Sequence, residues 1–521
     1  MSTRSYNDAV ECLNTLQSNF ATLEASRQSG GSLVKVAIPE TIEYLGRIGY
    51  KPEDLNALNV IHVTGTKGKG STCAFTDSII RQVKPNWKVG QHSLQWLGML
   101  LGLISVRNTT GLYTSPHLIA VRERIRINGV PISEEEFARY FFEVWDRLGE
   151  NNIRANPETH LRPMYFRFIT IVAFHAFLSL KVDATILEVG VGGTYDCTNV
   201  VPNPIVTGVS ALGIDHTAVL GKTIKEIAWQ KGGIYKKGVP ALTSNQPEDG
   251  LQVLRERAAE SQASEFLVAP LVPGLSTIKL GLSGKHQYQN ANLAVHLAKT
   301  FLRKQDSQNF DDTLPQTFVT ALQDTKWPGR CQVVPDPAHK NTTWFLDGAH
   351  TAESLECCMQ WFVSPDVSLR DSKETRPVRV MIFNCTSGRS GGSFLGSMLS
   401  KMAAQLALHG REENHLTFFD HVIFCSNVTY TDGGFKSDLT VKNLSDADLL
   451  HLKTQNDLAS AWKSLVPSFP ENHVHVLPSI EHAVNIVRDL QTDHNVDVLV
   501  AGSLHLVGGM IEVAGLSKEA L

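Results

Sequence analysis

The residues best suited to chemistry lie in a segment rich in glycine and lysine, VIHVTGTKGKGSTCAF, at positions 60–75. Apolar residues before Gly65 predict a buried strand, and the residues that follow the glycines predict a helix. Polyphosphate binding requires exposed backbone N–H groups, a helix N-terminus that faces the anion, a lysine, and a hydroxyl for magnesium. The segment offers all of these, because Lys69 could reach the β- and γ-phosphates while Ser71 or Thr72 faces the metal. We therefore predict a phosphate-binding loop.

The spacing of this loop departs from the common GxxxxGK[ST] pattern. Only two residues separate Gly65 from Gly68, and Gly70 intervenes between Lys69 and Ser71. This spacing argues against GTPases and kinases. A glycine-rich turn without a ligand is the weaker alternative, since a strand, two lysines and paired hydroxyls accompany the glycines. The short loop resembles that of the Mur-ligase superfamily, whose members activate carboxylates with ATP.

Three further polar residues follow apolar segments of the same half of the chain. Glu188 ends the predicted strand DATILEV, and Asp215 and His216 follow the next predicted strand. Carboxyl ends of parallel strands meet at one edge of a sheet, so Glu188 is a candidate magnesium ligand beside the phosphate loop, and His216 is a candidate residue of the same site. The alternatives are an ordinary strand-end glutamate and a solvated loop histidine. Lys231 lies near a helix end, where a lysine that interacts with the helix dipole is an equally good interpretation.

Length and composition are those of a globular protein with two or more domains, because the chain has 521 residues. Apolar residues make up 42%, charged residues 19%, and the net charge is −4. This balance gives no support for a nucleic-acid or membrane footprint. The eight cysteines have no metal-ligand spacing, which predicts reduced thiols. No secretory signal or transmembrane segment is evident. We expect a cytoplasmic location, with the mitochondrion as an alternative.

The order of predicted elements indicates an α/β protein with two sheets. An amphipathic helix is predicted at 7–27. Strands are predicted at 59–63, 183–189, 204–209, 343–346, 378–383, 421–425, 473–477 and 497–501. A Pro-Gly turn in KWPGR separates the halves, which predicts an N-terminal domain at 1–328 and a C-terminal domain at 329–521.

A series of motifs closely resembles the folylpolyglutamate synthase and dihydrofolate synthase family. In chain order these are TGTKGKGS, TSPHL, RERIRING, EVGVGGTYDCTN, GIDHT, QKGGIYKKG, WPGR, DGAH and GSLHLVGG. The resemblance implies a P-loop ATPase domain of the Mur-ligase type with a mostly parallel sheet, followed by a smaller Rossmann-like α/β domain. The forms GTKGKGS and RERIRING resemble the eukaryotic folylpolyglutamate branch.

The resemblance also implies roles for individual residues. ATP would contact Gly65, Gly68, Lys69, Gly70, Ser71, Asn290, Arg330 and Asp347; magnesium would contact Ser71, Ser115, Glu188 and His216; glutamate would contact His350 and Ser503. Lys69, Glu188, His216 and Lys231 would serve catalysis. Lys231 matches a lysine that is carbamylated in bacterial relatives. Similar enzymes use ATP and Mg²⁺, and often a monovalent cation such as K⁺.

The chemistry implied is ligation of L-glutamate to the γ-carboxylate of a reduced folate through an acyl phosphate. The partners would be small molecules only: folate, glutamate and ATP, bound by a monomer. Two alternatives stay open: a dihydrofolate synthase that adds the first glutamate to dihydropteroate, and a nucleotide-binding scaffold without activity.

One segment departs from the family pattern. Relatives run from the helix after the phosphate loop into a strand that reads roughly KVGLYTSPHL, whereas here residues 91–111 separate Gly90 from Leu112. This segment includes the apolar run LQWLGMLLGLISV. A translated intron is the favoured explanation, and a genuine insertion is the alternative.

Overall fold

The computed structural model describes residues 4–17, 36–83, 109–155, 157, 159–307, 310, 313–370, 376–385, 391–439, 451–492 and 494–521. The chain forms two compact units. The N-terminal unit comprises Met1–His117, Arg122–Gly281 and Gln287–Lys326, and the C-terminal unit comprises Leu118–Val121, Leu282–His286 and Trp327–Leu521. The main division thus falls between Lys326 and Trp327, and two short segments of the first half belong to the second unit.

The N-terminal unit is built on an eight-stranded sheet of order β4-β3-β2-β5-β1-β6-β7-β8. The strands from β2 to β8 in this order are parallel, and β3 and β4 form an antiparallel edge. Their bounds are β1 Val60–Thr64, β2 Thr110–Tyr113, β3 Ile125–Ile127, β4 Val130–Pro131, β5 Ala184–Glu188, β6 Val206–Val209, β7 Pro240–Thr243 and β8 Glu265–Val268. The central strands β1, β5 and β6 are buried along their whole length, as expected for parallel strands covered on both faces.

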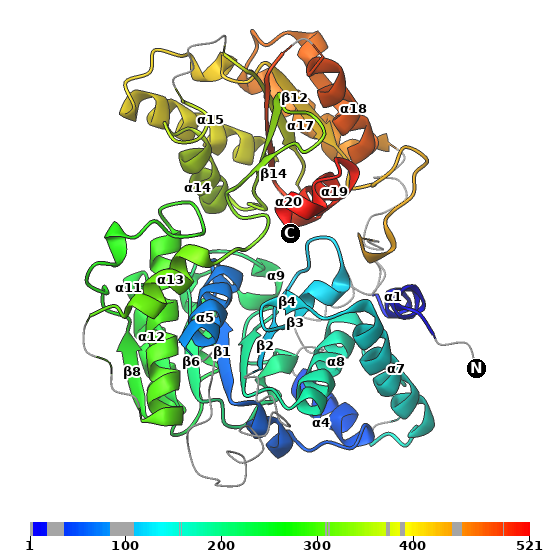
Figure 1. Ribbon diagram of the computed structural model, residues 1–521, viewed down its shortest axis with the longest axis vertical. Helices are drawn as coiled ribbons and strands as arrows, with labels where there is room; N and C mark the ends of the chain where they lie inside the picture. Colours follow the sequence, from blue (N-terminus) through cyan, green and yellow to red (C-terminus); the bar gives the residue numbers. More distant parts are fainter. Residues whose placement is uncertain are drawn as a thin grey trace, which may run out of the picture. The chain divides into compact units, whose positions relative to one another are not determined.

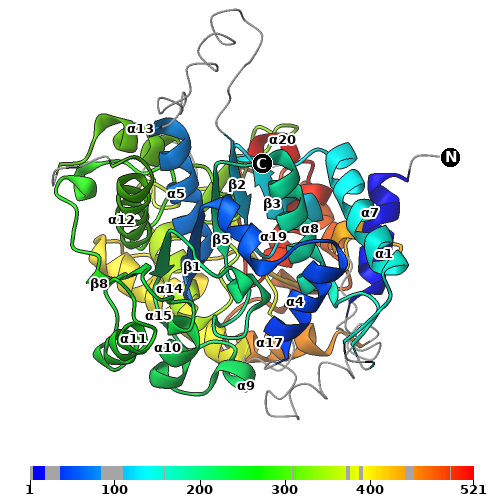
Figure 2. The same ribbon diagram turned by 90° about the horizontal axis from the view of Figure 1, so that it is seen from below.

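Helices cover both faces of this sheet. They are α1 Tyr6–Thr15, α4 Ala37–Arg47, α5 Lys69–Val83, α7 Glu134–Glu150, α8 Tyr165–Leu180, α9 Thr217–Leu220, α10 Ile224–Gly232, α11 Glu248–Glu260, α12 Gln287–Asp306 and α13 Gln316–Asp324. Helices α12 and α13 pack against α5 on one face (Figure 2). This packing fixes α5, the helix that follows the predicted phosphate loop.

The helix predicted at 7–27 is shorter in the structure. Helix α1 ends at Thr15, because the chain tightens there: the N–H of Leu16 bonds to the carbonyl of Leu13, three residues back, at 3.0 Å. Its amphipathic character is confirmed, since Val10 and Leu13 are buried. The remainder of the predicted range, from residue 18 onward, lies outside the described residues.

Strand β2 contains the last residues of the segment 91–111; residues 91–108 lie outside the described part of the chain. The hydroxyl of Thr110 donates to a carboxylate oxygen of Asp77 on α5 at 2.8 Å. Gly111 faces the other side of the sheet, where a Cβ atom would lie 2.9 Å from the ring of Phe177 on α8. Residues 110 and 111 are therefore strand residues packed between two helices.

The C-terminal unit contains a six-stranded sheet of order β13-β12-β11-β14-β10-β9. All its strands are parallel except β9. Their bounds are β9 Gln332–Pro335, β10 Thr342–Leu346, β11 Val378–Phe383, β12 His421–Cys425, β13 Val474–Leu477 and β14 Val496–Ala501. The predicted fold class, two α/β units with mostly parallel sheets, is confirmed.

Two hydrophobic clusters hold this second sheet between helices. Helices α14 (Ala352–Phe362), α15 (Gly391–Leu408) and α17 (Lys453–Leu465) build one cluster with one face of the sheet. Helices α18 (Ile480–Leu490), α19 (Leu504–Val513) and α20 (Ser517–Ala520) build the other. Figure 1 shows α14 and α15 on one side of the strands and α18 and α19 on the other.

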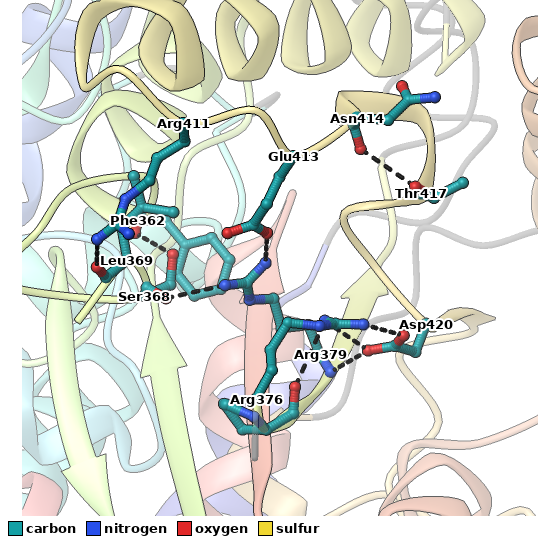
Figure 3. Close-up of polar contacts among 11 residues, drawn as sticks. Phe362, Ser368, Leu369, Arg376, Arg379, Arg411, Glu413, Asn414, Thr417 and Asp420 are labelled. Atoms are coloured by element: carbon teal, nitrogen blue, oxygen red, sulfur yellow. Dashed lines mark hydrogen bonds and ion pairs between the residues drawn. The ribbon is translucent and has the colours of Figure 1, made fainter. Parts of the chain in front are cut away.

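A buried arginine organises the amino end of β11 in this unit (Figure 3). The Arg379 guanidinium pairs with Glu413, donates to the carbonyl of Ser368 at 3.1 Å, and lies 4.0 Å from the centre of the Phe418 ring. The Arg379 backbone N–H donates to Asp420 at 2.8 Å. These contacts lie at the amino end of β11, whereas the candidate site residues follow the carboxyl ends of strands. We therefore interpret the Arg379 contacts as structural.

Among the described residues, no helix is both long and apolar enough to cross a membrane. All eight cysteines are free thiols.

Candidate nucleotide and metal site

Four adjacent parallel strands of the N-terminal unit end beside one another, in the order β2-β5-β1-β6. The predicted site residues lie at or beyond the ends of these strands: Glu188 is the last residue of β5, the phosphate loop follows β1, Ser115 follows β2, and His216 lies in the loop after β6. Ligand sites in open α/β sheets lie at this edge. The topology therefore gathers residues that are far apart in sequence.

The phosphate loop is tied to the end of β6. The backbone N–H groups of Thr66 and Lys67 both donate to the carbonyl of Ala211, at 2.9 and 3.0 Å. The hydroxyl of Ser210 donates to the carbonyl of Lys67 at 2.6 Å. These bonds fix the loop before any ligand binds, which lowers the ordering cost of binding a phosphate.

Two glycines of the loop cannot be replaced without a clash. Gly65 has φ +150°, and a Cβ there would lie 1.9 Å from the Ser210 hydroxyl. Gly68 has φ +78°, and a Cβ there would lie 2.0 Å from the side-chain oxygen of Asn290. Asn290, predicted to lie near adenine, is thus packed against the loop, and its amide donates to Gln287 at 2.9 Å.

Helix α5 begins at Lys69, so its free N–H groups lie at the loop. Lys69 and Gly70 are partly exposed, whereas Ser71 and Thr72 are buried. The Thr72 hydroxyl has no hydrogen-bond partner among the described residues. A buried hydroxyl without a partner is unusual, and it makes the Thr72 hydroxyl a candidate contact for a ligand at the loop.

Glu188 is a buried carboxylate at the edge of the loop. Its side chain is 3% exposed, and it lies in register with Val63, next to the loop. The backbone N–H of Ser115 donates to a Glu188 oxygen at 3.1 Å. Burial raises the pKa of the Cys73 thiol on α5 well above its ordinary value; the charge of Glu188 raises it further and that of Lys69 lowers it. The charges of Glu188 and Lys69 are therefore both close enough to Cys73 to shift its pKa.

His216 is exposed and caps the short helix α9 in a left-handed conformation, with φ 51°. Its backbone N–H donates to Asp215 at 2.9 Å. The other carboxylate oxygen of Asp215 lies 3.6 Å from the ammonium of Lys67 in the phosphate loop. The loop after β6 therefore brings the Asp215 carboxylate toward the phosphate loop, and His216 is its neighbour in the chain.

Lys231 is not a lysine at the surface end of a helix. Its side chain is buried, and its nitrogen donates to the carbonyl of Gly65 at 2.8 Å. Burial lowers the pKa of Lys231 well below its usual range, and the nearby Lys69 lowers it further. Lys231 therefore contacts the phosphate loop directly, and its burial excludes a solvated lysine at the end of the helix.

The residues fit magnesium bound together with a nucleotide. In the described part of the chain, no three Asp, Glu, His or Cys side chains are grouped to hold a metal ion by themselves. Mg²⁺ typically uses one or two carboxylates, with waters and substrate phosphates as its other ligands. Glu188 with nearby hydroxyls supplies this hard-oxygen donor set.

The C-terminal unit places its predicted residues after neighbouring strands as well. Asp347 follows β10 and Ser503 follows β14, and these strands are paired in parallel. The Asp347 carboxylate accepts from the N–H of Ala349 and from the N–H of Cys331, both at 2.7 Å. His350 contacts the carbonyl of Gly348 through its ring nitrogen Nδ1 at 3.1 Å.

Ser503 precedes helix α19 and is 9% exposed; its side chain makes no capping hydrogen bond to this helix. Arg330 directly precedes Cys331, and its guanidinium donates to the carbonyl of Gly329 at 3.1 Å. Asp347, His350 and Arg330 are thus close in this unit, while Ser503 lies at the end of the neighbouring strand.

Sequence reasoning missed two neighbours of Asp347. Cys331 directly follows the WPGR motif, and His286 lies in GKHQYQN. Burial lowers the pKa of His286; the charge of Asp347 opposes this shift and that of Arg330 adds to it. The position of Cys331 next to Arg330 was the sequence signal that could have placed it near the site. Its contact with Asp347 could not be predicted, because that contact depends on the pairing of β9 with β10.

Comparison with known proteins gives full-length relatives. The chain is 41% identical to a folylpolyglutamate synthase of Candida albicans, over 99% of this chain and 97% of that protein. It is also 41% identical to a folylpolyglutamate synthase of Saccharomyces cerevisiae (strain AWRI796), over 98% of this chain and 87% of that protein. No protein-family model matches the chain.

Solved structures share the fold. A Mycobacterium tuberculosis folylpolyglutamate synthase complexed with ADP and AMPPCP superimposes with TM-score 0.66 and 20% identity, covering 94% of this chain and 98% of that one. Escherichia coli FolC in complex with DHPP and ADP gives TM-score 0.62 and 19% identity, covering 96% and 99%. With motifs, fold and full-length relatives in agreement, the chain belongs to the folylpolyglutamate synthase family.

Proposed function

We propose that this chain is an ATP-dependent ligase that adds L-glutamate to the γ-carboxylate of a reduced folate or folylpolyglutamate. The observation that carries the proposal is the prebuilt phosphate loop, which has Lys69 at the start of α5 and the buried Glu188 beside it. The full-length Candida and Saccharomyces relatives are folylpolyglutamate synthases.

The reaction requires activation, because a carboxylate is a poor electrophile. The γ-phosphoryl group of ATP passes to a carboxylate oxygen of the folate, giving an acyl phosphate and ADP. The glutamate amine then attacks the acyl carbon, a C–N bond forms, the C–O bond to phosphate breaks, and the amine loses a proton. Lys69 and the first N–H groups of α5 would stabilise the charge on the transferred phosphoryl group.

Ser71, Ser115, Glu188 and His216 are the proposed magnesium residues. When bound, Mg²⁺ neutralises phosphate charge and orients the phosphoryl group. Of these residues, Glu188 is a buried carboxylate, and the N–H of Ser115 orients it at 3.1 Å. Lys231 lies next to the phosphate loop, at the carbonyl of Gly65. Its neutral amine could take up CO₂ and release a proton to become a carbamate.

The remaining assignments belong to the nucleotide and the glutamate. We assign Gly65, Gly68, Gly70, Asn290, Arg330 and Asp347 to ATP, and His350 and Ser503 to the incoming glutamate. Arg330 suits a phosphate, whereas a carboxylate such as Asp347 suits the hydroxyl or amino groups of the nucleotide.

The functional division at 1–328 and 329–521 is part of this proposal, as are a monomeric state, K⁺ as a monovalent cation, and a cytoplasmic or mitochondrial location.

A second candidate is a dihydrofolate synthase, because the E. coli FolC neighbour was solved with DHPP. It differs in the acceptor, dihydropteroate, and uses the same chemistry. A nucleotide-binding scaffold without activity is the third.

The proposal is tested by supplying purified protein with ATP, Mg²⁺, glutamate and tetrahydrofolate and measuring ADP. ADP release that requires both glutamate and folate is expected. ADP release that needs neither, or no release while nucleotide still binds, would reject ligation and favour the scaffold.

A further inference from the structure

Asp347 is held by three donors within the C-terminal unit, and two of them come from one residue. Its oxygen Oδ2 accepts from the backbone N–H of Cys331 at 2.7 Å and from the Cys331 thiol at 3.1 Å. Its oxygen Oδ1 accepts from the N–H of Ala349 at 2.7 Å. An ionised carboxylate has about four lone-pair sites, so this arrangement leaves one site, on Oδ1, for a ligand.

The backbone at Cys331 is in an uncommon conformation. Its φ is +45°, in the left-handed region that favours glycine. Residues held this way persist only where their surroundings fix them, and they cluster at functional sites. Here the conformation lets the N–H and the thiol of one residue reach the same carboxylate oxygen.

The thiol of Cys331 is a hydrogen-bond donor in this environment. Its side chain is 2% exposed, and burial together with the charge of Asp347 raises its pKa well above its usual range, which keeps the proton on sulfur. The nearby Cys358 thiol is buried too, and the charge of Asp347 also raises its pKa. The thiol that hydrogen-bonds to Asp347 among the described contacts is that of Cys331.

We propose that Cys331 is a positioning residue that orients the carboxylate of Asp347 for contact with ATP. This inference rests on the proposed function, in which Asp347 is an ATP residue. Without the thiol, Oδ2 keeps the backbone donor alone, so two donors hold the carboxylate in place of three and ATP meets a less firmly fixed partner. The effect concerns the nucleotide, and the folate and glutamate are bound by other residues.

The test uses full-length Cys331→Ala, Cys331→Ser and Asp347→Asn proteins, together with the double variant Cys331→Ala/Asp347→Asn. Loss of one hydrogen bond corresponds to about a twofold to tenfold change. We expect Cys331→Ala to raise the KM for ATP by this factor and to leave the KM values for glutamate and folate within about twofold. Cys331→Ser keeps a donor and should restore the KM for ATP.

Two controls separate positioning from loss of a buried thiol. Cys425→Ala removes a fully buried thiol from β12 of the same unit; it should lower the thermal midpoint without changing the KM for ATP. Cys331→Gly removes the thiol but suits φ +45°, so it should fold at least as well as Cys331→Ala and show the same rise in KM.

The double variant decides whether Cys331 acts through Asp347. If it does, adding Cys331→Ala to Asp347→Asn changes the KM for ATP no further. An additive effect, or an unchanged KM in both Cys331→Ala and Cys331→Gly, would overturn the positioning role. If Asp347→Asn itself leaves turnover and the KM for ATP unchanged, the assignment of Asp347 to ATP fails instead.

Discussion

The side-chain nitrogen of Lys231 donates to the carbonyl of Gly65, the first glycine of the phosphate loop, at 2.8 Å. The contact joins the end of α10 to the loop after β1, and burial lowers the pKa of Lys231 well below its usual range. A lysine with a lowered pKa therefore contacts the phosphate loop directly.

We predict that Lys231 makes stability depend on pH. Because the pKa of Lys231 is lowered on folding, the unfolded chain binds one more proton between the folded pKa and the ordinary value near 10.4. The free energy of unfolding should rise with pH in this window, by about 1.4 kcal/mol per pH unit from this group. Urea denaturation of nucleotide-free wild type and Lys231→Met measures it.

Lys231→Met should remove that slope and abolish ligation, while being at least as stable as wild type near pH 7. The stability difference between the two proteins should shrink as the pH rises toward 10. A parallel pH dependence in the two proteins would show that Lys231 is charged in the folded state.

We predict that Lys69→Ala lowers turnover by about 10²–10³-fold, because the transferred phosphoryl group loses a fixed positive charge. Steady-state ADP release measures the effect. Lys225→Ala is the control, since Lys225 is exposed and pairs with Asp249; its activity should match wild type. Turnover of the Lys69 variant within a few-fold of wild type would contradict the assigned role.

We predict that tetrahydrofolate accepts glutamate and that dihydropteroate does not. The basis is the GTKGKGS and RERIRING forms and the yeast-type folylpolyglutamate synthase relatives. Glutamate incorporation into each acceptor, offered separately at equal concentration, gives the answer. Efficient glutamylation of dihydropteroate would move the protein to the dihydrofolate synthase assignment.

We predict that Arg379→Ala lowers the free energy of unfolding of the C-terminal unit by about 1–3 kcal/mol, because the carbonyl of the buried Ser368 loses a donor and the Phe418 ring loses a packed guanidinium. The exposed Arg376, which pairs with Asp420, serves as the matched control. Arg376→Ala should cost less than about 1 kcal/mol. Denaturant titration measures both, and KM values should stay unchanged; an equal loss in the two variants would argue against a buried organising role.

We predict that a chain lacking residues 91–111 folds and is at least as active and more soluble than the full chain. The deletion joins Gly90 to Leu112, so glycine again precedes Leu112 where Phe177 leaves no room for a Cβ. Val89 would replace Thr110 and lose the bond to Asp77, at a cost of about 1 kcal/mol.

A control deletion of residues 89–109 has the same length and keeps Thr110. Its free energy of unfolding should exceed that of the 91–111 deletion by about 1 kcal/mol, because it keeps the hydrogen bond from Thr110 to Asp77. Inactivity of both deletions beside an active full chain would show that the segment belongs to the enzyme.

Much of this protein was determined by local sequence. The apolar runs at 378–383 and 421–425 became β11 and β12 with the predicted bounds, because parallel strands buried on both faces are continuous apolar segments. The phosphate loop was predictable for a related reason: its glycines, lysine and hydroxyls lie within a few residues, so their chemistry is visible without a fold.

Tertiary structure decided what depends on strand order and burial. Strand β7 was missed, because PALT is short and its place beside β6 follows from pairing. The environment of Lys231 could not be predicted, since a helix-end lysine is ordinarily solvated and only the packing of α10 buries it next to Gly65. The bonds from Cys331 to Asp347 likewise required the pairing of β9 with β10, which brings residues sixteen positions apart to one carboxylate.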